Sequence, residues 1–93
     1  MGAVLRISIS SAPEGTRLML EGQLIGPWVG ELEQACSPLL SQGFPLVLDL
    51  AAVSFVGREG VDLLWKLRDR RVTLRNCSRF VDEQLKAKAS HGH

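Results

Sequence analysis

The short segment LVLDL at residues 46–50 restricts the fold of this chain more than any other feature. A run this apolar, which follows Phe44-Pro45, is typical of a strand that is covered on both faces, and such strands belong to parallel sheets. Parallel neighbours need crossover connections, and these are usually helices. The segment therefore predicts an α/β fold in which residues 46–50 form a central strand.

The residues before this strand predict a hairpin. Leu5, Ile7 and Ile9 alternate with polar residues, which is the pattern of a half-buried strand. Residues 18–24 repeat this alternation, and the turn residues APEG at 12–15 separate the two segments. The pair is expected to form an antiparallel hairpin.

A helix is predicted between the hairpin and the central strand. Pro27 suits its first position, and apolar residues follow at helical spacing from Trp28 to Leu40. Gln42-Gly43 is expected to end it. Pro38 lacks the N–H that a helical hydrogen bond needs, so we expect a kink or a break there.

The residues after the central strand predict two helices with a fourth strand between them. Ala51 to Phe55 carries the chain to a loop at Gly57, and a helix ending at Asp69-Arg70 follows. Its apolar side consists of Val61, Leu64 and Leu67. The last strand contains Val72 and Leu74, and Ser78 is a suitable N-cap for a final helix. That helix is expected to direct Phe80, Val81 and Leu85 inward.

The predicted order is therefore β-β-α-β-α-β-α, a mixed four-stranded sheet with helices packed on it. We expect one domain over residues 1–93, with a core of about 4–88 and a flexible tail at 89–93.

Composition argues against several functional classes. The net charge of +1 gives no reason to expect nucleic acid or a membrane surface as partner, and the basic stretch from Arg68 to Arg79 is interleaved with acids, as a solvated rim would be. No apolar run approaches the length of a membrane span, and no secretory signal precedes the first strand, so a cytoplasmic location is expected. Cys36 and Cys77 lack metal-ligand spacing and are expected to be reduced.

Catalysis is not expected either. His91 and His93 lie in the tail, and the chain has no phosphate-binding Gly-rich loop and no Ser/His/Asp set, so general acid–base chemistry lacks its usual groups. The sequence predicts no enzyme activity, no metal site and no cofactor.

The segment LVLDLAAVSFV at 46–56, followed by a polar loop, Gly60 and a Leu-rich helix, resembles the STAS domain. That family comprises anti-sigma factor antagonists and the cytosolic domains of sulfate-type transporters. LEGQL at 20–24 is similar to the family's early L-x-G-x-L strand end, and residues 75–85 are similar to its last strand, turn and helix. The resemblance covers about residues 5–86 and implies a STAS fold and a regulatory, protein-binding role.

The loop before the second helix departs from the family's pattern. In STAS antagonists it reads Asp-Ser-Ser/Thr-Gly, and a partner kinase phosphorylates the second hydroxyl residue, which switches binding to the anti-sigma factor. This chain has Gly57, Arg58 and Glu59 in the first three places and keeps Gly60. The resemblance thus implies a partner-binding loop, but Glu59 in the acceptor position offers no hydroxyl to phosphorylate.

Glu59 has two main interpretations. The first turn of a helix favours an anion by about 0.3–1 kcal/mol, so Glu59 is a suitable helix-start residue in a domain without the switch. Alternatively it is a weak, permanent imitation of phosphoserine, which carries a charge of about −1.5 to −2. Unrelated recognition is a third possibility. Arg58 is either a partner contact or a solvated side chain, and Trp65, which breaks the regular apolar row, is a candidate interface anchor.

Three functions stay open at this point. The leading hypothesis is a bacterial regulatory module that presents six residues to a protein partner, such as an anti-sigma factor or a kinase-like protein: Gly57, Arg58, Glu59, Gly60, Val61 and Trp65. The second is an accessory subunit of a larger assembly, such as a lipid-transport complex. The third is a nucleotide- or small-ligand-binding STAS domain. The oligomeric state is open as well.

Overall fold

The computed structural model describes residues 4–13 and 15–91. Within them the chain follows the predicted order of strands and helices: β1 (Leu5–Ala12), β2 (Gly15–Leu24), α1 (Pro27–Ser41), β3 (Leu46–Val56), α2 (Arg58–Asp69), β4 (Thr73–Arg75) and α3 (Arg79–His91). The strands form one sheet in the order β1-β2-β3-β4, in which β1 is antiparallel to β2 and the other neighbours are parallel. The predicted mixed α/β sheet is confirmed.

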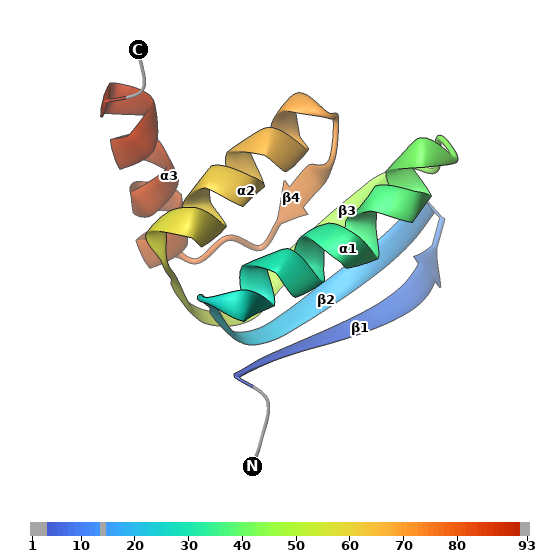
Figure 1. The fold of residues 1–93 in the computed structure, drawn as a ribbon, viewed down its shortest axis with the longest axis horizontal. Helices are drawn as coiled ribbons and strands as arrows, with labels where there is room; N and C mark the ends of the chain where they lie inside the picture. The colour runs from blue at the N-terminus through green and yellow to red at the C-terminus, as the bar shows by residue number, and fades with distance from the viewer. Residues whose placement is uncertain (1–3, 14, 92–93) are drawn as a thin grey trace.

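The core lies between the sheet and the helices, and all three helices contribute to it. α1 and α2 lie beside each other over one face of the sheet, and α3 lies next to α2 on the side away from α1 (Figure 1). Strand alternation directs Leu18, Leu20, Leu48 and Leu50 to the covered face, where each is at most 1% exposed. Burying a side chain of this size contributes about 1.5–3 kcal/mol, so this layer is the main source of stability.

The hairpin depends on the glycine at position 22. Gly22 has a φ of +113°, and a Cβ placed on it would collide with the carbonyl oxygen of Val4. The close approach lets the N–H of Gln23 donate to that oxygen at 2.9 Å. Gly22 therefore brings the start of β1 against the end of β2, because only glycine adopts this conformation without strain.

Two predicted boundaries differ from the structure. β3 continues through Ala51–Phe55 to Val56, because two irregularities in its pairing with β2 let the strand follow its neighbour past Leu50. The expected break at Pro38 is wrong, since α1 runs without interruption to Ser41. Pro38 lies in the last turn, where its carbonyl still accepts from the N–H of Gln42 at 3.2 Å.

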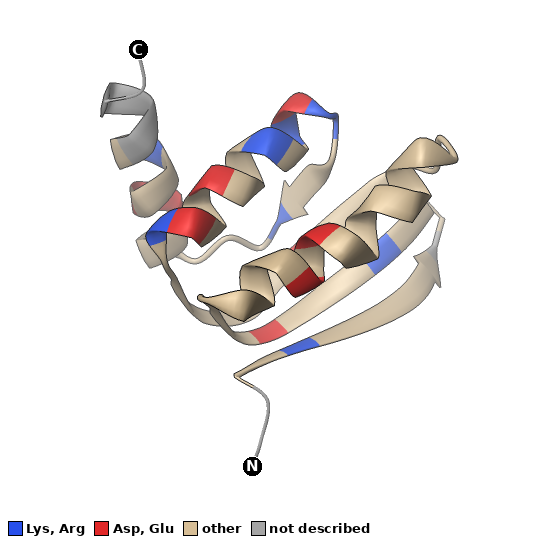
Figure 2. Cartoon of the chain, in the orientation of Figure 1, with Lys and Arg blue, Asp and Glu red and all other residues tan. Residues whose placement is uncertain are grey.

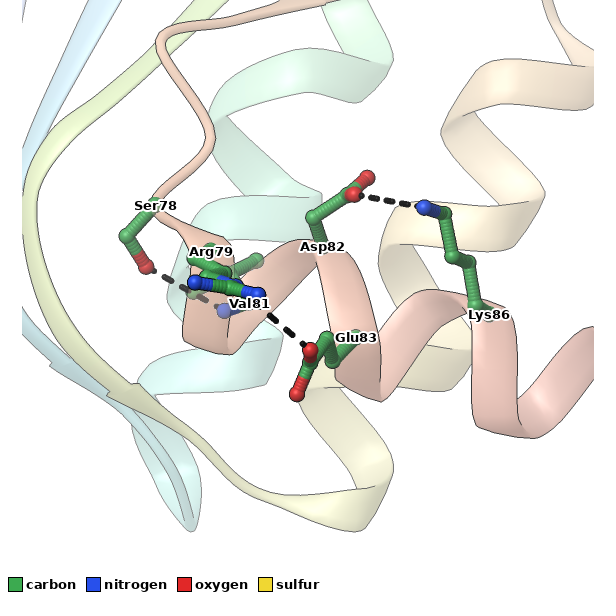
Figure 3. Close-up of polar contacts among 6 residues, drawn as sticks. All are labelled: Ser78, Arg79, Val81, Asp82, Glu83 and Lys86. Atoms are coloured by element: carbon green, nitrogen blue, oxygen red, sulfur yellow. Dashed lines mark hydrogen bonds and ion pairs between the residues drawn. The ribbon is translucent and has the colours of Figure 1, made fainter.

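Helix α3 begins as the sequence predicts but presents one side chain differently. Ser78 Oγ accepts a hydrogen bond from the N–H of Val81 at 3.2 Å, which satisfies a free donor of the first turn (Figure 3). Val81 and Leu85 are buried, whereas Phe80 is 50% exposed, so the expected inward direction of Phe80 is wrong. Phe80 immediately precedes Val81, and a helix directs neighbouring residues about 100° apart.

The surface of α3 is held by ion pairs one turn apart. Arg79 lies 3.7 Å from Glu83, and Lys86 lies 3.2 Å from Asp82 (Figure 3). Pairs this exposed contribute about 0.3–0.5 kcal/mol each. The helix takes in residues 89–91 of the expected tail, while residues 92–93 lie outside the described chain. None of the described helices is both long enough and apolar enough to cross a membrane.

Candidate functional site

The parallel strands direct three connections to one edge of the sheet. β2, β3 and β4 run in the same direction, so the loops that follow them all leave the sheet at its carboxyl edge (Figure 1). In open α/β sheets ligands bind at this edge. Gly57 is the middle of the three connections and joins β3 to α2. Arg58, Glu59 and Gly60, which the sequence analysis placed in a loop, form the first turn of α2. We refer to the four residues together as the 57–60 loop.

Two glycines hold the 57–60 loop against the end of β2. The N–H of Gly57 donates to the carbonyl oxygen of Leu24 at 3.0 Å. Gly60 is buried, and a Cβ on it would lie 2.7 Å from the same oxygen and 2.8 Å from Cγ1 of Val56. The first turn of α2 can therefore approach the sheet this closely only because Gly60 has no side chain.

The two residues between these glycines face outward. Arg58 and Glu59 are both exposed, and a positive and a negative charge follow each other at the start of α2 (Figure 2). Glu59 lies in the first turn, as the sequence predicts, and Gly57 is the N-cap without a side-chain hydrogen bond. The loop thus alternates between glycines that fit the fold and charged side chains that face solvent.

An aromatic pair adjoins the loop. Phe55, at the end of β3, and Phe80, at the start of α3, are 41% and 50% exposed, and their ring centroids lie 5.9 Å apart. Gln84 fixes α3 at this point, because its Nε2–H donates to the carbonyl oxygen of Val56 at 2.7 Å. Two exposed, mutually packed phenylalanines form an apolar patch that the sequence analysis missed. The sequence analysis placed Phe55 in a connection between the central strand and the loop, and it expected Phe80 to point into the core.

The remaining predicted site residues lie below or beside this surface. Val61 is 6% exposed and packs in the core, so Gly60 and Val61 position the loop and do not form its surface. Trp65 is half-buried; its indole N–H donates to the carbonyl oxygen of Leu85 at 3.1 Å, and Arg68 lies 4.9 Å over its ring. Trp65 therefore fastens α3 to α2 within the chain.

A buried carboxylate was also missed. Asp49 is 9% exposed and its Oδ1 accepts from the N–H of Ala51 at 3.0 Å and from Nδ2 of Asn76 at 3.1 Å. The hydrogen bond from Ala51, and then that from Asn76, lower the pKa of Asp49. The available signal in the sequence was a single acidic residue within an otherwise apolar strand, which indicates a carboxylate with hydrogen-bond partners. Asp49 ties β3 to the connection between β4 and α3.

The two cysteines are free and offer no reactive thiolate. Cys36 is buried, and burial raises the pKa of its thiol to about 11. Burial also raises the pKa of the half-buried Cys77, and the carboxylate of Asp82 adds to this effect. At neutral pH both side chains are therefore protonated and act as small apolar groups.

Comparison with known proteins agrees with this geometry at the level of the fold. No protein-family model and no curated protein sequence matches the chain. Among solved structures, the crystal structure of an anti-sigma factor antagonist from Mycobacterium paratuberculosis is similar, with a TM-score of 0.65 and 22% sequence identity. The match covers 75% of this chain and 63% of that one, so it spans less than two thirds of the similar protein. The likeness confirms the predicted STAS-like fold.

Proposed function

We propose that this chain is a non-catalytic, protein-binding regulatory module that works in the bacterial cytoplasm. Its partner would bind the loop surface, which we define as the exposed side chains of Phe55, Arg58, Glu59 and Phe80. The observation that carries the proposal is the exposed aromatic pair of Phe55 and Phe80 at the carboxyl edge of the sheet, where Phe55 precedes Arg58 by three residues in the chain.

This combination of side chains suits a protein partner. Aromatic residues and arginine are enriched among the residues that dominate the binding energy of protein interfaces. Aromatic side chains bury a large apolar area, and arginine offers several hydrogen-bond donors in a planar group. Contiguous exposed apolar side chains mark interaction sites more often than single ones do. Opposite charges at Arg58 and Glu59 would fix the orientation of the partner and select among partners more than they would add affinity.

The fold suggests the class of partner. The similar solved protein is described as an anti-sigma factor antagonist, which supports an anti-sigma factor or a related kinase-like protein as the partner of this chain. Glu59 offers no hydroxyl group at the position that corresponds to the family's phospho-acceptor. Binding through this surface would therefore not be switched by phosphorylation of the loop.

Capture of partners from the source organism tests the proposal. The wild-type chain and a Phe80→Ala variant would be immobilised, and bound proteins would be compared by quantitative mass spectrometry. Phe44→Ala is the matched control, since Phe44 is 49% exposed but precedes β3 at the other edge of the sheet. We expect Phe80→Ala to reduce capture of a specific protein at least about tenfold, which is about 1.4 kcal/mol, and Phe44→Ala to leave it unchanged. Equal capture by all three proteins would refute the loop surface.

Glu59 needs a separate experiment with the partner so identified. If its charge imitates a phosphate, Glu59→Gln changes the affinity for the partner severalfold and its salt dependence. If Glu59 only favours the start of α2, the same variant lowers the free energy of unfolding by about 0.3–1 kcal/mol and leaves the affinity unchanged. The two interpretations therefore predict changes in different measurements.

A permanent subunit of a larger assembly is the competing function. In that function Trp65, the candidate interface anchor, would pack against another chain, but its indole N–H already donates to the carbonyl oxygen of Leu85 within this chain. A complex of fixed stoichiometry that survives purification, and that Phe80→Ala does not weaken, would favour the assembly subunit over the regulatory module.

A further inference from the structure

The outer edge of β1 lies at the opposite end of the strand order from β4 and has no partner strand among the described residues. The strand is eight residues long, and its pairing with β2 has no bulge. An unprotected edge of this length is a template for pairing with another strand.

The hydrogen bonds of the hairpin show which backbone groups face outward. The N–H of Gln23 donates to the carbonyl oxygen of Val4, so the pair Val4–Gln23 is a hydrogen-bonded pair. Such pairs alternate along an antiparallel ladder, so the even-numbered residues of β1 bond to β2. The N–H and C=O groups of Leu5, Ile7, Ile9 and Ser11 therefore point to the free edge.

The sequence of β1 is complementary to itself around Ser8. In RISIS at residues 6–10, Ile7 and Ile9 lie symmetrically on either side of this serine. If a second copy pairs antiparallel with Ser8 opposite Ser8, Ile7 of each copy faces Ile9 of the other. Both isoleucines have outward-facing backbone groups, so this register also satisfies the hydrogen-bond pattern.

The exposed side chains and charges suit the same arrangement. Ile9 is 61% exposed, and the opposite Ile7 would cover it on the helix-bearing face of the sheet. β1 carries little charge (Figure 2), since Arg6 is its one charged residue and lies 3.7 Å from Glu21 of β2. Arg6 would face Ser10 of the second copy, so no like charges lie opposite each other.

The other edge of the sheet lacks these properties. β4 has only three residues, and both its ends, Thr73 and Arg75, are polar and exposed. Short and charged strands are a common protection of sheet edges against pairing. The two edges of this sheet thus differ, and β1 is the one open to a second chain.

We propose that a second copy of this chain pairs with β1, antiparallel and with Ser8 on the twofold axis, to form a continuous eight-stranded sheet. A strand pair alone buries less than the roughly 1,200–2,000 Å² of a standard stable interface, so the dimer is weak and depends on concentration. The carboxyl edge is not involved, and the proposal is independent of the loop surface.

Sedimentation equilibrium of the wild-type chain tests the proposal first. We expect the average mass to rise from 10.2 kDa towards twice that value as the concentration increases from about 10 µM to about 1 mM. Ile9→Lys places a charge against Ile7 of the second copy and is expected to weaken association at least about tenfold. Met19→Lys is the control, since Met19 is 47% exposed on β2, away from the free edge. A mass that stays at one chain throughout, or equal weakening by both variants, would overturn the proposal.

Cross-linking then tests the register, in a Cys77→Ser background. Two Ser8 residues on the axis would form a non-hydrogen-bonded pair with Cα atoms about 4.5 Å apart, within disulfide range. In the same register, Ser10 of one copy and Ser10 of the other are offset by four residues, which is about 13 Å along the strand. Ser8→Cys is therefore expected to form a covalent dimer under mild oxidation, and Ser10→Cys is not. Equal cross-linking, or none at Ser8→Cys, would contradict this register.

Discussion

Gly57 and Gly60 lie three residues apart, but they differ in how much space a side chain would have at each position. Gly60 faces the Leu24 carbonyl and the Val56 side chain at distances that leave no room for a Cβ. Gly57 has an ordinary extended conformation, with φ −79° and ψ 177°, and its nearest neighbour would be Cγ2 of Ile25 at 3.3 Å. Of these two glycines, packing requires only Gly60, which lies in the first turn of α2.

Gly60→Ala is therefore expected to destabilise the chain by about 1–3 kcal/mol, because α2 or the end of β2 must move to admit the methyl group. Gly57→Ala, the matched control, is expected to change the free energy of unfolding by less than about 1 kcal/mol. Urea unfolding of both variants measures this difference. Similar midpoints for the two would show that the close approach at Gly60 can relax without cost.

Residue patterns predicted the roles that depend on local chemistry. The cap at Ser78 and the first-turn position of Glu59 follow from rules about helix ends, which need only neighbouring residues. Phe80 and Asp49 could not be assigned in this way. The exposure of Phe80 depends on how α3 lies against β3, and the hydrogen bond of Asp49 reaches Asn76, 27 residues further along the chain.

At the scale of elements, α1 shows how a helix tolerates an unfavourable residue. Pro38 has no N–H to donate to the carbonyl of Gln34, and the sequence therefore predicts an interruption. The helix nevertheless continues to Ser41, and Cys36 in the same stretch is fully buried. Packing of the apolar face against the sheet outweighs one lost hydrogen bond, and only a tertiary contact could reveal this.

Replacing Pro38 should restore the lost hydrogen bond and raise the free energy of unfolding. Pro38→Ala restores a donor to the last turn and is expected to stabilise the chain by about 2 kcal/mol, since a gain of about 3 kcal/mol is offset by about 0.4–1 kcal/mol for the greater freedom of the unfolded chain. Pro27→Ala is the control at the first helical position, where proline is favourable, and should lower stability by up to about 1 kcal/mol. Thermal unfolding measures both, and a lower melting temperature for Pro38→Ala would disprove the explanation.

At the scale of the whole molecule, the order of the elements along the chain and the directions of the strands followed from the sequence, because periodicity and connection length set them. The central position of β3 and its parallel neighbours are consequences of its apolar run. The extension of β3 past Leu50 was not predictable, because irregular pairing with β2 carries it there. The hydrogen bond between Asp49 and Asn76, which ties β3 to the β4–α3 connection, was not predictable either.

That tie makes the stability of the fold depend on pH. Hydrogen bonds lower the pKa of Asp49 in the folded state, so its contribution is fully present above the unfolded value of about 3.9 and is lost as pH falls through the folded value. Asp49→Asn is expected to cost about 1–3 kcal/mol at pH 7, and this difference should shrink below about pH 4. Denaturant unfolding across this pH range measures it; a difference that grows in acid would have the wrong sign.

Asn76 supplies the control for this measurement. It has a φ of +58°, so Asn76→Gly keeps the backbone conformation while removing the amide donor. Asp49→Asn removes the charge that strengthens this hydrogen bond, and Asn76→Gly removes its donor. Because both changes act on one interaction, the sum of their separate losses in free energy of unfolding should exceed the loss in the double variant. Simple additivity would mean that Asp49 is stabilised by Ala51 alone.

The alternation within the 57–60 loop has a consequence for how such a protein can change over generations. Gly60 cannot vary without moving a helix, whereas Arg58 and Glu59, which face solvent beside it, contribute no contact on which the core depends. Mutations at these two positions therefore carry a folding penalty of at most about 1 kcal/mol, which is the contribution of a charge in the first turn of a helix. Natural selection can adjust what the surface recognises one residue at a time, while the scaffold that displays it is inherited unchanged.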